Sequence, residues 1–172
     1  MPIPSSQMTW AVLSDTGVPF GEMAARMAVA ALMGVLIGWE RSLSDKPAGP
    51  RTMVMISVGA AAFALIGLDL LEQNLGGPGI RTDPTRVLSY LISGVGFLGA
   101  GAILHSKKSI SGLTTAAGIW GVAAMGAACG YGLYKIAVLV FVFVAAALWM
   151  PWAYRGLTAE RNNGNNHNES AL

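Results

Sequence analysis

The uncharged run "VLSYLISGVGFLGAGAILHS", residues 87–106, decides how the rest of the sequence is interpreted. A helix rises about 1.5 Å per residue, so about twenty apolar residues cross the hydrocarbon core of a bilayer. The run also spells G-x-G-x-x-G from Gly94 to Gly99, a pattern that cradles phosphates where a strand turns into a helix. Here the glycines lie inside one continuous apolar segment. They therefore indicate close helix contact rather than nucleotide binding, because glycine lets two helix backbones approach.

The composition of the whole chain favours a membrane protein. Apolar residues make up 53% of the 172 residues and charged residues 12%, and the mean hydropathy is +0.54. A soluble domain has about 25% charged residues. So few charges cannot cover a water-soluble globule of this size, which predicts an integral membrane protein surrounded by the lipid bilayer. The net charge of +2 is too small to suggest a nucleic-acid partner.

Five segments have the length and composition of membrane-spanning helices, which predicts an all-α, polytopic, glycine-rich bundle. The expected helices are Glu22–Trp39, Thr52–Leu71, Thr85–Leu104, Leu113–Tyr131 and Leu133–Trp152. We therefore expect a five-helix transmembrane domain over residues 22–154. An extracytoplasmic segment at residues 1–21 precedes it, without the features of a cleavable signal peptide, and a disordered cytoplasmic tail at residues 155–172 follows.

The distribution of basic residues predicts the orientation of the bundle, because lysine and arginine gather in cytoplasmic loops. Seven basic residues fall on one side of five spans: Arg41, Lys46, Arg51, Lys107, Lys108, Arg155 and Arg161. Three fall on the other side: Arg81, Arg86 and Lys135. The sequence therefore predicts an N-terminus outside the cell and a C-terminus in the cytoplasm.

Glycines recur at helical spacing in three of the expected helices. The first carries Gly34 and Gly38, the fourth carries Gly126 and Gly130, and the third carries Gly94, Gly96, Gly99 and Gly101. Small residues four apart form a groove that accepts a partner helix. We therefore expect the first, third and fourth helices to pack glycine to glycine, and Gly99→Leu to disrupt that packing.

Charged residues near the outer ends of the expected helices allow two interpretations. Glu22 and Arg26 stand four apart and can pair on one helix face, while Arg26 could instead snorkel or reach Asp69 or Asp83. Asp83, followed by Pro84, is typical of a helix N-cap. Structural ion pairs and caps are the simpler interpretation. The alternative is a cation site of Asp69, Glu72 and Asp83, since Mg²⁺ needs only one or two carboxylates plus waters.

The stretch "GWERSLSDKPAGPRT", residues 38–52, marks the inner ends of the first two helices. Glu40 and Arg41 end the first helix, and Arg51 and Thr52 begin the second. The stretch is either a plain interfacial loop or a docking surface for a partner. Further along, Ser111 or Thr114 could cap the fourth helix. Thr115 could bond across helices, or form with Thr114 and Ser93 the polar face of a transport path.

Nothing in the sequence assembles a catalytic or cofactor site. The histidines, His105 and His167, do not share a motif, and the single cysteine, Cys129, cannot form an internal disulfide. No G-x-S-x-G pattern is present, and no nucleophile stands beside a base. We therefore expect neither enzymatic activity nor a cofactor.

Four blocks in sequence carry a family resemblance: "GVLIGWERS", "AGPRT", "DPTRVLSYLISGVGFLGAGAIL" and "GLTTAAGIWGVAAMGAACGYG". With them, the chain from about Arg26 to Tyr134 resembles the MgtC/SapB family of bacterial inner-membrane proteins. The family pattern carries over onto Glu40, Arg41, Gly49, Arg51, Thr52, Asp83, Arg86, Gly94, Gly96, Phe97, Gly99, Gly101, Gly112, Thr114, Thr115, Ala116, Ala117 and Trp120.

The resemblance implies a multi-pass protein of the bacterial plasma membrane, in a family linked to growth in low Mg²⁺ and to survival inside host cells. Its members were first named Mg²⁺ transporters, but regulation of partner membrane proteins, including the ATP synthase, is the better-supported role. Virulence-linked members carry a folded cytoplasmic domain where this sequence has its asparagine-rich tail, so the virulence role is not expected to carry over.

The expected function is therefore non-enzymatic. The protein would modulate membrane partners or membrane energisation under Mg²⁺ limitation or stress, as a homo-oligomer or with another membrane protein. The alternative is a transporter or channel for Mg²⁺ or another cation.

Overall fold

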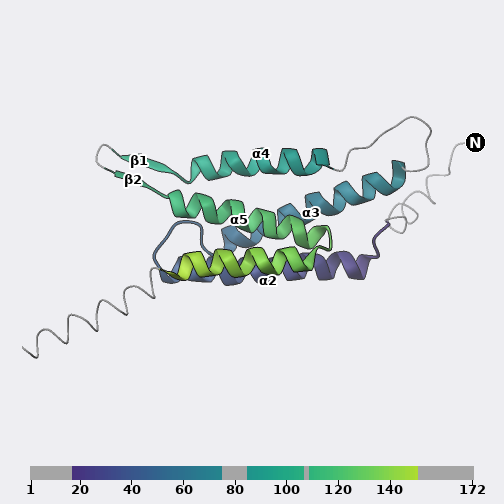
Figure 1. The fold of residues 1–172 in the computed structure, drawn as a ribbon, viewed down its shortest axis with the longest axis horizontal. Helices are drawn as coiled ribbons and strands as arrows, with labels where there is room; N and C mark the ends of the chain where they lie inside the picture. The colour runs from purple at the N-terminus through teal and green to yellow at the C-terminus, as the bar shows by residue number, and fades with distance from the viewer. Residues whose placement is uncertain (1–16, 75–84, 107–108, 151–172) are drawn as a thin grey trace, which may run out of the picture.

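The computed structural model describes residues 17–74, 85–106 and 109–150. In these residues the chain forms five helices and one short hairpin (Figure 1). The labelled elements are α2 (Phe20–Leu43), α3 (Pro50–Asn74), α4 (Thr85–Gly101), β1 (Leu104–Ser106), β2 (Ser109–Ser111) and α5 (Leu113–Gly130), and a further helix, Tyr134–Met150, follows them. The all-helical, five-helix architecture predicted from the sequence is confirmed. The expectations for residues 1–16 and 155–172 lie outside the described residues.

The third helix is shorter than predicted and leads into a hairpin that the sequence did not indicate. α4 ends at Gly101 rather than Leu104, and β1 pairs antiparallel with β2, with Leu104 opposite Ser111. α5 then starts after Gly112, which has φ 88°. A Cβ at Gly112 would lie 2.1 Å from the carbonyl oxygen of Ala102, so only glycine fits this corner. The N-cap of α5 is Gly112, without a side-chain cap, rather than Ser111 or Thr114.

The helices alternate in direction, so the described loops gather at two ends (Figure 1). The α2–α3 loop, residues 44–49, lies at one end with the β1–β2 hairpin, and we call this the hairpin end. The start of α2 and the turn at residues 131–133 lie at the opposite end. α3 and α5 therefore run parallel to each other, and both begin at the hairpin end. Which end faces the cytoplasm remains a prediction from the basic residues.

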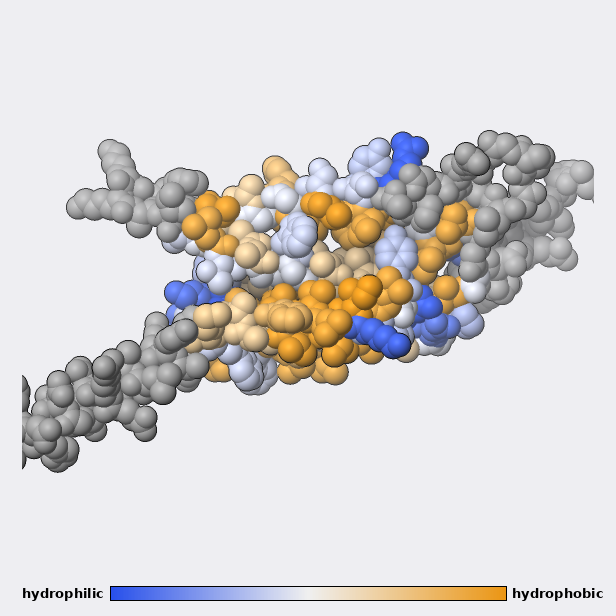
Figure 2. Space-filling view, viewed as in Figure 1, coloured by the Kyte–Doolittle hydropathy of each residue, from blue (hydrophilic) through white to orange (hydrophobic). Residues whose placement is uncertain are grey.

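The outward faces of the helices are apolar, as contact with lipid requires. α2, α3 and α5 are long and apolar enough to cross a membrane, and Arg86–Gly101 and Tyr134–Met150 are shorter apolar helices. Large side chains point outward, among them Phe97 at 81% exposed and Phe143 at 71%. Figure 2 shows this orange apolar surface along the helices, with blue hydrophilic residues close to their ends. The chain is a multi-pass membrane protein.

The interior is built from small side chains around α5, of which 67% is buried. Half of the buried hydrophobic residues that the structure describes are small: Ala30, Ala60, Ala61, Ala64, Ala123, Ala127, Ala128, Cys129 and Ala137. Membrane helices associate through such residues, because lipid tails give no hydrophobic drive between apolar surfaces. A buried hydrogen bond links two of these helices: Ser57 Oγ of α3 donates to the Ala30 carbonyl of α2 at 2.8 Å.

Four of the predicted contact glycines lie directly against the backbone of α3. A Cβ on Gly34 or Gly38 of α2 would lie 3.0 Å from the Met53 oxygen or 2.4 Å from the Pro50 Cα. A Cβ on Gly126 or Gly130 of α5 would lie 2.2 Å from the Ser57 oxygen or 2.4 Å from the Ala61 oxygen. Because no side chain fits in these spaces, α2 and α5 hold α3 backbone to backbone.

The glycines of α4 differ from the expectation. Cβ atoms on Gly94, Gly96 and Gly101 would meet no described atom within 4 Å, and one on Gly99 would make ordinary contact with Ala116, at 3.7 Å. Glycine spacing marks where a helix can be approached, but it does not say which helix approaches. The glycine faces of the first and fourth predicted helices therefore lie against the second helix, while the third helix meets the fourth at ordinary contact distance near Gly99.

The close contact at Gly126 predicts a selective loss of stability. Gly126→Ala places a methyl group 2.2 Å from the Ser57 oxygen, and overpacking of this kind costs about 1–3 kcal/mol. We expect a lower midpoint of thermal unfolding in detergent. The matched control is Gly94→Ala, which adds the same methyl group to open space, and its midpoint should be unchanged or slightly higher. Equal destabilisation of the two variants would contradict the observed packing.

Candidate functional site

A buried ion pair closes the hairpin end of α2. Glu40 and Arg41 both have side chains 5% exposed. Arg41 Nε donates to Glu40 Oε2 at 2.7 Å and Arg41 Nη2 to Glu40 Oε1 at 3.1 Å. Ser44 Oγ also donates to Glu40 Oε1, at 2.8 Å. Both carboxylate oxygens are thus satisfied, and the buried charges cancel within one helical turn.

The geometry of this pair is unusual for a helix. Neighbouring residues on a helix do not normally face each other, yet the Arg41 side chain folds back onto Glu40. Burying two charges is expensive, so a buried pair adds little net stability. Removing one partner, however, leaves the other charge buried without compensation. The pair therefore makes the hairpin end of α2 sensitive to single changes while leaving it electrically neutral.

The loop that follows carries the chain directly back into the bundle. Asp45 has φ 50° and Ala48 has φ 63°, left-handed conformations that residues other than glycine adopt reluctantly. Pro50 then begins α3, a position that suits its fixed φ, and it lies against Gly38 of α2. The turn that joins α2 to α3 is thus tight and is held by a glycine–proline contact.

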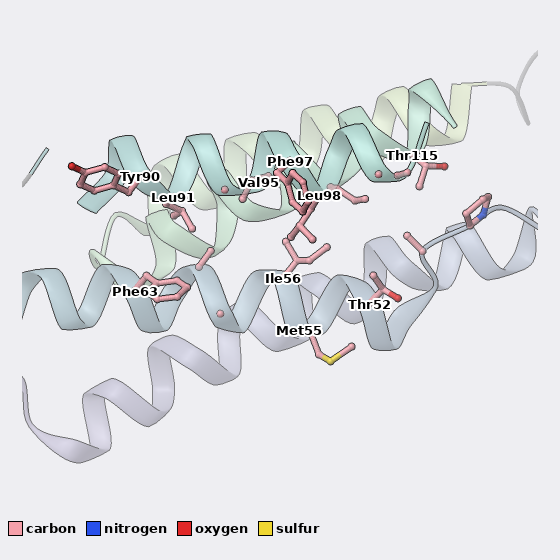
Figure 3. Close-up of a pocket in the computed structure, with 18 of the residues that line it drawn as sticks. Thr52, Met55, Ile56, Phe63, Tyr90, Leu91, Val95, Phe97, Leu98 and Thr115 are labelled. Carbon is pink, nitrogen blue, oxygen red and sulfur yellow. The ribbon is translucent and has the colours of Figure 1, made fainter. Parts of the chain in front are cut away.

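A long apolar groove separates α3 from α4 (Figure 3). The groove has a volume of about 1050 Å³. The two helices touch near its far end, where a Cβ on Gly67 would lie 3.2 Å from Val87. Elsewhere its walls are apolar side chains and unfilled glycines: Met55, Ile56, Gly59, Phe63, Leu91, Gly94, Val95 and Leu98.

Two hydroxyl groups line the hairpin end of this groove. Thr52 belongs to the first turn of α3 and Thr115 to the first turn of α5, and Figure 3 shows them on its two sides. Thr115 is only 2% exposed. The structure gives its hydroxyl no hydrogen bond among the described residues, so the expected bond across helices is not present there. Arg51 and Thr114, beside these two, are exposed.

At the opposite end, Arg26 joins two helices. Its guanidinium pairs with Glu22, as the spacing predicted, and its Nη1 donates to the carbonyl oxygen of Gly130 at 2.7 Å. Arg26 therefore caps the C-terminus of α5, where a positive charge suits the helix dipole, instead of reaching Asp69. Burial raises the pKa of the phenol of Tyr131, which follows α5 directly.

The candidate cation ligands are only partly described. Asp69 Oδ1 accepts a hydrogen bond from the Gly17 backbone at 3.3 Å. The side chain of Glu72, and Asp83 as a whole, lie outside the described residues, as does the predicted N-cap role of Asp83. Within the described ranges, no three acidic, histidine or cysteine side chains gather closely enough to hold a metal ion. Arg86 is exposed at this end, and Trp120 is 53% exposed on α5.

Some residues of this arrangement were not singled out from the sequence. Ser57 was missed, although a lone hydroxyl inside an apolar helix could have signalled a bond between helices. Gly132 was also missed. It has φ 73° in the turn after α5, and a Cβ there would lie 3.2 Å from the Arg26 guanidinium carbon. The groove between α3 and α4 had no signal in the sequence, because it depends on how far apart two helices lie.

Comparison with known proteins identifies the family of the chain. The sequence profile described as the MgtC family matches residues 27–153. The chain belongs to the MgtC family. SapB of Bacillus subtilis (strain 168) is 37% identical over 142 residues, which cover 81% of this chain and 61% of SapB. MgtC of Brucella abortus (strain 2308) is 41% identical over 128 residues, covering 74% of this chain and 50% of that protein.

A third relative, from Escherichia coli (strain K12), is named as a candidate magnesium transporter, YhiD. It is 36% identical over 151 residues, which cover 88% of this chain and 69% of YhiD. The chain thus spans only about half to two thirds of the length of these MgtC-family relatives. No solved structure matches the chain.

The buried pair predicts a difference between single and double substitution. Glu40→Ala strands the Arg41 guanidinium and should cost about 3–5 kcal/mol, seen as a lower midpoint of thermal unfolding in detergent. Replacing both residues by methionine removes both charges and should recover most of that loss. A double variant as unstable as Glu40→Ala would show that the pair is not the reason for the sensitivity.

Proposed function

We propose that this MgtC-family protein acts without enzymatic chemistry, by packing against another membrane protein or a second copy of itself. Through that contact it modulates membrane partners or membrane energisation under Mg²⁺ limitation. We place it in the bacterial plasma membrane, with the hairpin end in the cytoplasm. The observation that carries the proposal is the outer face of α4.

That face presents small residues to the bilayer. Ser93, Gly96 and Ala100 follow at spacings of three and four and are all exposed, and a Cβ on Gly96 would meet no described atom within 4 Å. Small residues at this spacing let helices approach closely. The glycine pairs Gly34–Gly38 of α2 and Gly126–Gly130 of α5 are already engaged with α3, whereas the small residues on this face of α4 are exposed and can receive another helix.

The charges of the described residues also support a binding role. Glu40 is neutralised by Arg41, and Glu22 by Arg26. The large groove has mostly apolar walls, with Thr52 and Thr115 at one end and Tyr90 towards the other. Such a lining suits hydrocarbon or a helix better than a hydrated ion, which needs polar or charged groups along its path.

Substitution at Gly96 tests the proposal. Gly96→Leu fills the small-residue face, and its Cβ would meet no described atom within 4 Å, so the fold should persist. The amount of partner crosslinked in native membranes should fall about tenfold, a change of about 1.4 kcal/mol. Cells carrying this variant in place of the natural protein should grow poorly in low Mg²⁺. The matched control is Ala146→Leu, which changes an exposed small residue on the helix Tyr134–Met150. Recovery of the monomer alone from wild-type membranes would overturn the proposal.

A cation transporter is the second candidate, because a relative, YhiD, carries that description. Purified protein in liposomes distinguishes the two functions. Mg²⁺ flux that Asp83→Asn abolishes would favour transport, whereas no flux from the wild-type protein would favour the partner-binding role.

A further inference from the structure

We propose that the groove between α3 and α4 is a binding site for an anionic phospholipid. One acyl chain lies along the groove, and the phosphate lies at the hairpin end, against the first turns of α3 and α5. This inference does not depend on the outer face of α4 or on a protein partner.

The body of the groove fits hydrocarbon. Ile56 and Phe63 of α3 face Leu91 and Leu98 of α4 across it (Figure 3). Gly59 and Gly94 add width, since a Cβ on either would meet no described atom within 4 Å. An empty apolar space forfeits the dispersion contacts of the atoms that line it. In a bilayer an acyl chain is the flexible apolar molecule always available to fill such a space.

The hairpin end of the groove favours negative charge. α3 and α5 run parallel, so both N-termini lie there, each with a partial positive charge and N–H groups that lack acceptors within the helix. Thr52 and Thr115 line the groove from these two first turns, and Arg51, exposed beside Thr52, adds a full charge. Together they form an anion-binding arrangement at one end of the apolar groove.

Thr115 gives independent evidence for a polar ligand. Thr115 is only 2% exposed and lines the groove. Its hydroxyl has no hydrogen bond among the described residues. A buried hydroxyl without a partner is costly, and nearly all such groups in proteins are hydrogen-bonded. A phosphate or ester oxygen of a lipid headgroup is an acceptor of the kind that this hydroxyl lacks.

The acidic groups near this end do not oppose an anion. The Glu40 carboxylate is held by Arg41 and Ser44. Asp45 is exposed in the loop next to Lys46, which is also exposed. No acidic side chain lines the groove in the part of the chain that the structure describes. The local charge therefore favours an anionic headgroup over a zwitterionic one, as basic residues at membrane surfaces do in general.

The test uses the full chain in a mild nonionic detergent. Phosphatidylglycerol, phosphatidylcholine with the same acyl chains, and inorganic phosphate are added separately. The midpoint of thermal unfolding and the lipid retained after gel filtration are measured. Phosphatidylglycerol should raise the midpoint and remain bound, phosphatidylcholine should do so much less, and inorganic phosphate should have no effect. Equal effects of the two lipids, or stabilisation by phosphate alone, would overturn the proposal.

Variants locate the site. Thr115→Val and Arg51→Gln should each weaken phosphatidylglycerol binding about tenfold, since each removes a contact to a charged group. Thr115→Ser should retain binding. Gly94→Leu should block the acyl chain, and Arg86→Gln, at the opposite end, is the control. If Thr115→Val fails to fold, the result for Gly94→Leu decides. Lipid retention by Gly94→Leu that equals that of the wild-type protein, with or without loss of a dimer, would overturn the proposal.

Discussion

The structure depends on direct contact between the backbone of α3 and the glycines of its two neighbours. Gly38 of α2 and Gly126 and Gly130 of α5 leave no space for even a methyl group against α3, and Gly34 of α2 leaves very little. In a bilayer the hydrophobic effect does not hold helices together, so close packing and a few hydrogen bonds must do so. The Ser57–Ala30 hydrogen bond adds to the same α2–α3 contact. These three helices form the unit on which the other elements are placed.

Different side-chain contacts close the two ends of this unit. At one end Arg26 joins α2 to the C-terminal carbonyl of α5 and pairs with Glu22. At the other end Glu40 and Arg41 neutralise each other within α2, and Gly38 holds Pro50. α4 takes part in neither set of contacts. It meets α5 near Gly99 and α3 near Gly67, and between these contacts it leaves the groove open.

The sequence predicted the membrane fold well because long apolar runs have few structural alternatives. It also predicted the Glu22–Arg26 pair, since four residues separate two charges on one helix face. It could not predict the partner of each glycine helix, because Gly99 and Gly126 look alike in sequence. A Cβ on Gly126 would lie 2.2 Å from the Ser57 oxygen, whereas one on Gly99 would lie 3.7 Å from the Ala116 oxygen. The sequence also could not predict the Arg26–Gly130 hydrogen bond or the position of Thr115 beside the groove. Both depend on contacts between helices far apart along the chain.

The small-residue interior has a consequence for how this protein tolerates change. In a water-soluble domain, the vulnerable positions are large buried side chains whose truncation leaves cavities. Here the interior holds mostly alanine and glycine, while large side chains such as Phe97 and Phe143 face the lipid. Truncating those large residues removes little internal contact, whereas a single added carbon inside separates two backbones. Sensitivity to substitution is thus the reverse of that in a water-soluble domain, because the smallest residues are the hardest to replace.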